Sequence, residues 1–365
     1  MNFDYFLSSP QGDRKADTAL LASPFLISLT EHHSILTLGD YFSALKKFAL
    51  NRPKLTGAES IRIRSEKHGA LYHIASLTAT LPEQTLKLTV SSALSENGKI
   101  CLARDFNHID QLNKSLNLPF LPAVYAIEPI APETFPGNLS FLMVLAEWFD
   151  DHHEWHLTKN GQEIMLWDHV RGNRLLDQTA TFAVFRQIAA ILTQYYDVPS
   201  ARQIHPWHHA AGDFIVNEED GDIRVRLTTA RDYCRLSLPF RDSGDSPLIA
   251  LLFFFLHLTI RTRLDRVEGV DAPVWAAEFA VPATVTGFFE ALIAMTGRNQ
   301  IPPGMVDSLL TMLRSCTPAE LAAMSKPLLN FYNEESPHEV AFIADHLEEH
   351  STNLHAALKM INPNA

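Results

Sequence analysis

Cysteine is scarce in this sequence. The 365 residues include three cysteines, Cys101, Cys234 and Cys316, which lie far apart and form no Cys-x-x-Cys pair. We therefore expect neither a disulfide framework nor a zinc site built on cysteines, because both need several cysteines at characteristic spacings. The scarcity of cysteine, together with first residues that show no basic-then-apolar signal pattern, predicts a cytoplasmic protein.

Basic residues and long apolar runs are also limited. The chain has 30 Lys and Arg against 42 Asp and Glu, which gives a formal net charge of −12. Because nonspecific binding to nucleic acid or to an anionic membrane needs a basic surface, we expect neither as a partner. The most apolar run, Pro247–Ile260, is too short to span a bilayer and predicts a buried helix. An unknown small molecule or protein is the expected substrate.

Two common motifs are missing. No Gly-x-Gly-x-x-Gly follows a predicted strand, and no Gly-x-Ser-x-Gly occurs, which argues against a Rossmann dinucleotide site and against a serine-hydrolase elbow. The length and the 46% hydrophobic content are those of a soluble globular protein with room for two well-packed lobes.

The first half of the chain predicts a small sheet. After an extension over residues 1–55, to which we assign no chemistry, apolar and polar residues alternate with a period of two, which is typical of strands. The expected elements are strands over 60–64, 71–81 and 86–90, a helix over 100–118, and strands over 124–127 and 139–145.

The second half predicts mostly helices around one polar loop. The sequence Ile-His-Pro-Trp-His-His-Ala-Ala-Gly-Asp-Phe-Ile-Val occupies 204–216 and contains three of the seventeen histidines. A helix over 178–196 precedes it, and a hairpin over 214–227 begins at its end. Further helices are expected over 248–263, 276–296, 305–314 and 339–361. A helix, a polar loop and two short strands in that order are typical of an active-site loop.

In this order of elements the chain resembles the protein-kinase-like and aminoglycoside-phosphotransferase-like superfamily. The resemblance implies an α+β, bilobal fold with a small antiparallel-sheet N-lobe over 56–147 and a larger, mainly helical C-lobe over 148–365. It places Lys87 on the third strand, where it would grip the phosphates of ATP, and Asp105 on the following helix, where it would hold that lysine. Glu147 and Trp148 fall at the interlobe hinge and would line the nucleotide site.

The loop 204–216 carries the rest of the resemblance. Aligning its apolar end with the family pattern puts Asp213 at the position that binds magnesium and His208 at the position of the catalytic aspartate. A carboxylate is a suitable ligand for Mg²⁺, and an imidazole can take a proton from a hydroxyl. His205 and His209 flank His208 and would orient it or cap the loop. Asp232 is the candidate for the second metal ligand.

The departures from the pattern leave two functions open. A single glycine, Gly69, stands where the family has a glycine-rich loop, and Thr228 and Thr229 stand near the position of its second metal-binding aspartate. The chain is therefore either a divergent phosphotransferase that uses ATP and Mg²⁺, or a pseudokinase that binds a nucleotide or a protein.

Two other groups of residues deserve an interpretation. The run Asp150–His156 is rich in acids and histidines, and His205, His208 and Asp213 would make a two-histidine, one-carboxylate set, so a metalloenzyme is a further alternative. The arginines of Arg261–Arg266 alternate with Asp265. They indicate a salt-bridged helix end, with anion binding as the alternative.

Overall fold

The computed structural model describes residues 1–9, 12–25, 36–69, 71–132, 139–168, 171–236, 246–335 and 337–361. The chain forms two compact units. The first comprises Met1–Asp150 together with Thr229–Arg231, and the second comprises Asp151–Thr228 and Asp232–Ala365. The domain boundary predicted after residue 147 therefore lies three residues before the division at Asp150, and a short segment from later in the chain returns to the first unit.

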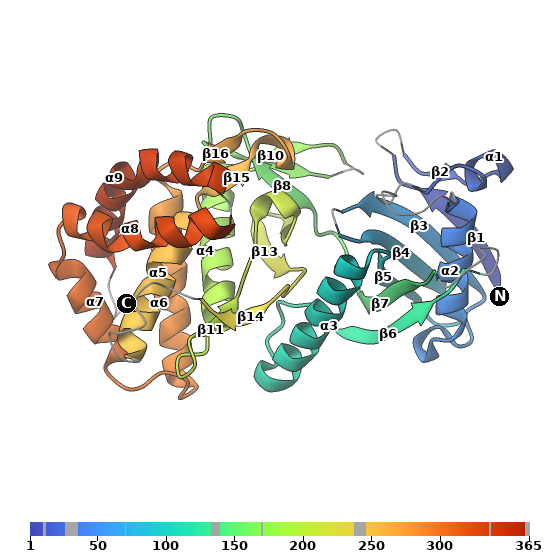
Figure 1. Ribbon diagram of the computed structural model, residues 1–365, viewed down its shortest axis with the longest axis horizontal. Helices are drawn as coiled ribbons and strands as arrows, with labels where there is room; N and C mark the ends of the chain where they lie inside the picture. The colour runs from blue at the N-terminus through green and yellow to red at the C-terminus, as the bar shows by residue number, and fades with distance from the viewer. Residues whose placement is uncertain are drawn as a thin grey trace. The chain divides into compact units, whose positions relative to one another are not determined.

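The first unit is built on a seven-stranded sheet, seen at the blue end of the ribbon in Figure 1. Its spatial order is β2-β1-β3-β4-β5-β7-β6, in which β1 runs parallel to β3 and the other neighbours are antiparallel. The strands are β1 Asn2–Leu7, β2 Arg14–Lys15, β3 Ser60–His68, β4 His73–Thr80, β5 Thr85–Ala93, β6 Val124–Ile130 and β7 Phe141–Glu147.

Buried and more exposed positions alternate along strands of this sheet. On β3, for example, Ile61 and Ile63 are buried while Arg62 between them is exposed, because successive side chains point to opposite faces. Helix α2 (Leu38–Leu50) packs in the larger core, and helix α3 (Glu96–Leu116) packs against a smaller cluster around Val144. The first unit is thus a sheet with a helix on each face.

The first 55 residues belong to this unit as structural parts. Besides β1 and β2 they supply the short helices α1 (Thr18–Leu21) and η1 (Pro53–Leu55) and the whole of α2. Helix α2 begins at a capping box in which Thr37 and Asp40 satisfy each other's backbone amides. The predicted extension therefore completes the sheet and its core.

The second unit is mainly helical with short two- and three-stranded sheets, as Figure 1 shows. Its helices are α4 Gln178–Gln194, α5 Pro247–Arg261, α6 Ala280–Gly297, α7 Met305–Ser315, α8 Pro318–Glu335 and α9 Pro337–Met360, with 3-10 turns η2 His209–Ala211 and η3 Val267–Gly269. Its strands are β8 Glu154–Leu157, β9 Ile164–Trp167, β10 Arg174–Leu175, β11 Arg202–Ile204, β12 Phe214–Glu219, β13 Asp222–Leu227, β14 Tyr233–Arg235, β15 Leu264–Arg266 and β16 Pro273–Trp275.

The protein is a mixed fold of helices and strands, which is compatible with the predicted α+β class. The hairpin β12–β13 and the helices α4, α5, α7 and α9 lie where the sequence pattern indicated. Helix α8 and the strands β8 to β10 have no counterpart in the prediction, since short strands and a helix interrupted by Pro327 give weak periodicity.

Helix α6 is the one described helix that is long and apolar enough to cross a membrane. Within the structure 61% of it is buried against other parts of the protein. Most of its length therefore packs as a core helix does, and α5, the predicted buried helix, is likewise enclosed.

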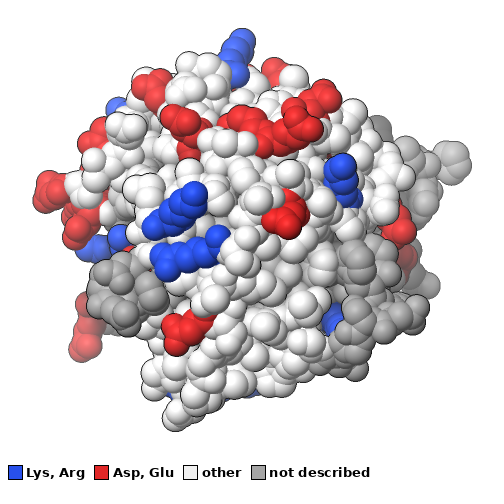
Figure 2. Space-filling model, turned by 90° about the vertical axis from the view of Figure 1, so that its left-hand side faces the viewer, with Lys and Arg blue, Asp and Glu red and all other residues white. Residues whose placement is uncertain are grey.

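Figure 2 shows the side of the second unit on which α7, α8 and α9 lie in Figure 1. Acidic side chains gather along the upper part of this face. The basic side chains of the described residues drawn there form no continuous patch.

Candidate functional site

Lys87 lies beside the end of β7 in the first unit. Its neighbour Leu88 pairs with Glu147 in the ladder between β5 and β7, which brings the lysine next to the residues that follow the strand. The Lys87 ammonium lies 4.4 Å from the centre of the Trp148 ring and 3.5 Å from an oxygen of Asp150. This corner therefore combines an aromatic ring with a partly exposed cation.

Glu147 has a structural role at this corner. Its carboxylate accepts a hydrogen bond from the amide of Ala123 at 3.0 Å, and its own amide donates to the carbonyl of Ala123. Its carbonyl accepts the hydroxyl of Thr89 at 3.3 Å. Because both backbone groups and the carboxylate are engaged, Glu147 fixes the chain at the end of β7.

The predicted pairing of Lys87 with Asp105 is corrected by the structure. The ion pair of Lys87 is with Asp150, and the carboxylate of Asp105 is directed elsewhere. Aspartate is one methylene shorter than the glutamate that the family uses at this position. The shorter Asp105 side chain therefore suits a partner that packs against helix α3 better than it suits a lysine on the sheet.

That partner is the segment 229–231, which belongs to the first unit. One oxygen of Asp105 accepts both the Thr229 hydroxyl, at 3.0 Å, and the Ala230 amide, at 2.6 Å. One turn further along α3, His108 donates from Nδ1 to the carbonyl of Ala230 at 3.3 Å. Asp105 and Thr229 are both buried. Helix α3 therefore anchors the segment that follows the hairpin β12–β13.

Asp105→Ala is expected to destabilise the protein by about 2 to 4 kcal/mol, because it leaves a hydroxyl and an amide without their acceptor in a buried position. Asp110→Ala on the same helix is the control: its exposed pair with Lys114 contributes under about 0.5 kcal/mol. Urea unfolding monitored by circular dichroism compares the two. Equal midpoints would show that the Asp105 contacts contribute nothing.

In the second unit, Asp213 closes the histidine loop. Its carboxylate accepts the amide of His208 at 2.8 Å, and its carbonyl accepts the amide of Thr228 at the end of the hairpin. Asp213 is 1% exposed. Gly212 precedes it with a φ of 68°, where a side chain would meet Glu154. The five-residue spacing between His208 and Asp213 is thus a closed turn with a buried carboxylate.

The tautomer of His208 follows from its partner. The guanidinium of Arg261 lies 2.8 Å from His208 Nδ1. A guanidinium only donates, so Nδ1 carries the lone pair and the proton of the neutral ring is on Nε2. In this arrangement neither ring nitrogen accepts a proton from a substrate. His208 is therefore not set up as the predicted base.

The two carboxylates predicted to bind magnesium are each held by the backbone. One oxygen of Asp232 accepts the amide of Tyr233 at 2.8 Å, and its carbonyl accepts the amide of His205. Within the described part of the chain, no group of three or more His, Cys, Asp or Glu residues is arranged to hold a metal ion. His205, His208 and Asp213 therefore do not form such a group.

The second unit contains a pocket of about 260 Å³ beside this loop. It is lined by His208, His209, Ala210, Ala211, Arg261, Leu264, Asp265, Arg266, Gly269 and Glu339. Arg261 and Arg266 both bind Glu339, at 3.1 and 3.0 Å. The arginine-rich helix end is thus salt-bridged as the sequence indicated, although its acid comes from helix α9 rather than from the same run.

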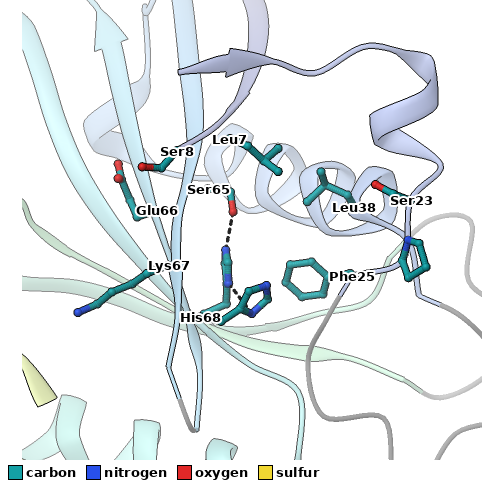
Figure 3. Close-up of a pocket in the computed structure, with 11 residues that line it drawn as sticks. Leu7, Ser8, Ser23, Phe25, Leu38, Ser65, Glu66, Lys67 and His68 are labelled. Atoms are coloured by element: carbon teal, nitrogen blue, oxygen red, sulfur yellow. Dashed lines mark hydrogen bonds between the residues drawn. The ribbon is translucent and has the colours of Figure 1, made fainter. Parts of the chain in front are cut away.

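The first unit contains a larger pocket of about 440 Å³, shown in Figure 3. A chain of hydrogen bonds borders it: Ser65 Oγ lies 2.7 Å from His73 Nε2, and His73 Nδ1 lies 2.8 Å from His68 Nδ1. Phe25 forms an apolar wall beside the two rings. Sequence reasoning did not identify these hydrogen bonds. A β-bulge between Ser65 and Lys67 lies beside them, and no local sequence pattern signals it.

Burial sets the protonation state of the two histidines in this chain of hydrogen bonds. It lowers the pKa of His73 to about 3, with the nearby His68 adding to the effect, and it also lowers the pKa of His68. Both rings are therefore neutral near pH 7. A general base works best with a pKa near the operating pH, so His73 is a weak activator for Ser65. The hydrogen bonds among Ser65, His73 and His68 therefore satisfy buried polar groups, and they do not activate Ser65 as a nucleophile.

Comparison of the chain with protein-family models and with curated proteins finds no match.

Proposed function

We propose that the protein is a cytoplasmic, bilobal, kinase-like protein that binds a nucleotide and does not transfer its phosphoryl group. The order of elements supports the kinase-like part: three strands, a helix and two strands, with the strand lysine beside the end of the last strand. The hydrogen bond from Arg261 to His208 carries the second part, because it removes the base that a phosphotransferase of this type needs.

The nucleotide part of the proposal rests on Lys87 and Trp148. An aromatic ring can stack on a base, and an ammonium can pair with a phosphate. The Asp150 carboxylate that now meets Lys87 is exposed, and an exposed ion pair contributes little, so a phosphate can replace it at small cost. In the family pattern an acid on the following helix holds the lysine. Here Asp105 binds Thr229 and Ala230 instead, so Lys87 would bind the phosphates without that support.

An active phosphotransferase is the second candidate, on the basis of Asp213. This buried carboxylate is fixed five residues after His208, as the resemblance requires of a magnesium ligand. Magnesium would neutralise phosphate charge there. Its carboxylate already receives the His208 amide, however, and Asp232 receives the Tyr233 amide. These donors favour nucleotide binding that does not depend on the metal.

Thermal melting with ATP, with and without Mg²⁺, tests the proposal. ATP at a hundred times its dissociation constant adds about 2.7 kcal/mol of stability, a rise of several degrees in Tm. We expect this rise without metal, and we expect Lys87→Ala to abolish it. Lys99→Ala, which removes a lysine on helix α3 whose partner is Glu96, is the control and should retain it.

The two candidates give different results in the same assay. A rise that requires Mg²⁺ and disappears in Asp213→Ala would establish the phosphotransferase and refute the metal-independent site. The absence of any rise with ATP, ADP or GTP would refute nucleotide binding altogether.

A further inference from the structure

The 440 Å³ pocket of the first unit joins exposed residues to buried apolar ones. Pro24 and His68 line it and are exposed, and Leu7 is half-buried. Phe25 and Leu38 line it as well and are buried. In Figure 3 the rings of His68 and Phe25 lie on one side of this space, and the leucines lie on the other. The volume is typical of a small-molecule site, and the exposed residues make it reachable.

His68 has one ring nitrogen left for a ligand. Its Nδ1 lies 2.8 Å from His73 Nδ1, and His73 Nε2 lies 2.7 Å from Ser65 Oγ. The three neutral side chains carry three exchangeable protons, and two of these lie in the two hydrogen bonds. The third lies either on His68 Nε2, which then donates, or on Ser65, in which case His68 Nε2 accepts. A ligand hydroxyl suits both states because it donates and accepts.

Two serines that line the pocket add one donor and one acceptor. Ser8 Oγ accepts a hydrogen bond from Arg64 at 2.9 Å, so its hydroxyl proton remains to donate. The Ser23 hydroxyl donates to the carbonyl of Leu20, so its lone pairs remain to accept. Both serines are half-buried. The accessible polar groups of the pocket therefore suit uncharged hydroxyl groups.

The charges around the pocket favour a neutral ligand. Burial lowers the pKa of His68 and lowers that of His73 to about 3, so both rings are neutral near pH 7. Glu66 lines the pocket and pairs with Arg64 at 2.6 Å. Its carboxylate repels an anion, and a cation has to compete with Arg64 for it. The Lys67 side chain points away from the histidine rings in Figure 3. A charged ligand would thus lose hydration without gaining a dedicated partner.

We propose that this pocket binds a small neutral phenol, whose hydroxyl bonds to His68 Nε2 and whose ring packs beside Leu7 and Phe25. The centres of the Phe25 and His68 rings lie 5.2 Å apart. An aromatic ligand extends this pair, and contacts between aromatic rings add to the effect of the apolar area that they bury. The proposal does not rest on nucleotide binding, which concerns the corner at Lys87.

Ligand-observed NMR on the full chain tests this with three probes built on one ring. The probes are 4-methylphenol, toluene, which lacks the hydroxyl, and 4-methylbenzoate, which carries a negative charge. We expect saturation transfer to 4-methylphenol. From titrations we expect at least about fivefold weaker binding of toluene, the effect of one hydrogen bond, and at least about tenfold weaker binding of 4-methylbenzoate.

Variants locate the binding. His68→Phe keeps a ring and removes its nitrogens, and we expect about fivefold loss of affinity for 4-methylphenol. Pro24→Trp places a large ring at an exposed position of the pocket, away from the histidine hydrogen bonds, and should block binding even if His68→Phe fails to fold. Pro53→Trp makes the same change at an exposed proline of the same unit that does not line the pocket, and it should bind as the wild type does.

Several results would overturn the proposal. They are no saturation transfer to 4-methylphenol, equal affinity for toluene, binding of 4-methylbenzoate as tight as that of 4-methylphenol, full binding in Pro24→Trp, or unchanged affinity in folded His68→Phe.

Discussion

Gly287→Ala is expected to leave little folded protein, whereas Gly297→Ala in the same helix is expected to be tolerated. Both glycines lie in α6, which packs along α4. A Cβ at Gly287 would lie 1.9 Å from the carbonyl oxygen of Arg186, and 2.8 Å from its carbonyl carbon. Backbone atoms inside a helix cannot rotate away as a side chain can, so the two helices would have to separate. We expect a loss of more than about 3 kcal/mol.

Gly297 makes the comparison a controlled one. No heavy atom lies within 4 Å of a Cβ at this position, and alanine is a better helix former than glycine. Gly297→Ala should therefore change stability by no more than about 1 kcal/mol, in the favourable direction. Soluble yield and Tm by circular dichroism measure both variants. If Gly287→Ala had the same Tm as the Gly297 variant and the wild type, the close approach of α4 and α6 would be wrong.

The close approach of two helices shows where sequence reasoning ends. Periodicity located α4 and most of α6, because each helix buries apolar residues at helical spacing. A glycine inside a helix indicates a close contact in general, but the partner at Arg186 lies about a hundred residues away. The same limit applies to β1, whose parallel pairing with β3 joins residues nearly sixty positions apart. Long-range pairing leaves no mark in a local pattern.

For the candidate site, the sequence located residues but not their partners. The resemblance singled out His208 and Asp213 in the loop 204–216, and the backbone amide of His208 donates a hydrogen bond to the Asp213 carboxylate. The loop alone could not reveal that Arg261 would fix the tautomer of His208, because Arg261 lies on another helix. Asp105 illustrates the same point: its residue type is that of an ion-pair partner for Lys87, yet its bonds run to Thr229 and Ala230. The roles of these residues in binding stay predictions.

Acidification from pH 7 to pH 5 is expected to remove a large share of the stability. Burial lowers the pKa of His73 to about 3, of His209 to about 4 and of His350 to about 3, and it lowers the pKa of His257 well below its usual value. These rings are neutral when folded, but the unfolded chain binds protons below about pH 6.5. Their contribution is therefore complete above pH 6.5 and is lost as the pH falls toward 4.

The size of this loss can be compared with the stability of a typical protein. Each histidine with a pKa near 3 or 4 in the folded state lowers the free energy of unfolding by about 2 kcal/mol at pH 5. The loss from His73, His209 and His350 together is therefore about 6 kcal/mol. Native proteins have about 5 to 15 kcal/mol in all. His209, His257 and His350 lie in the second unit, together with Trp155, Trp207 and Trp275. Tryptophan fluorescence should therefore report acid unfolding of that unit.

A single variant isolates the effect of one histidine. In His350→Gln the difference in unfolding free energy between pH 7 and pH 5 should shrink by about 2 kcal/mol, because one proton uptake by the unfolded chain is removed. His338→Gln changes an exposed histidine, whose side chain is 65% exposed, and should leave that difference as it is in the wild type. Urea unfolding at both pH values gives the comparison. If all three proteins lost the same amount of stability, His350 would be protonated inside the fold. The surroundings of His350 oppose this, because its ring lies beside the Thr259 hydroxyl and the Trp275 ring, and neither group offers a carboxylate to compensate a buried positive charge.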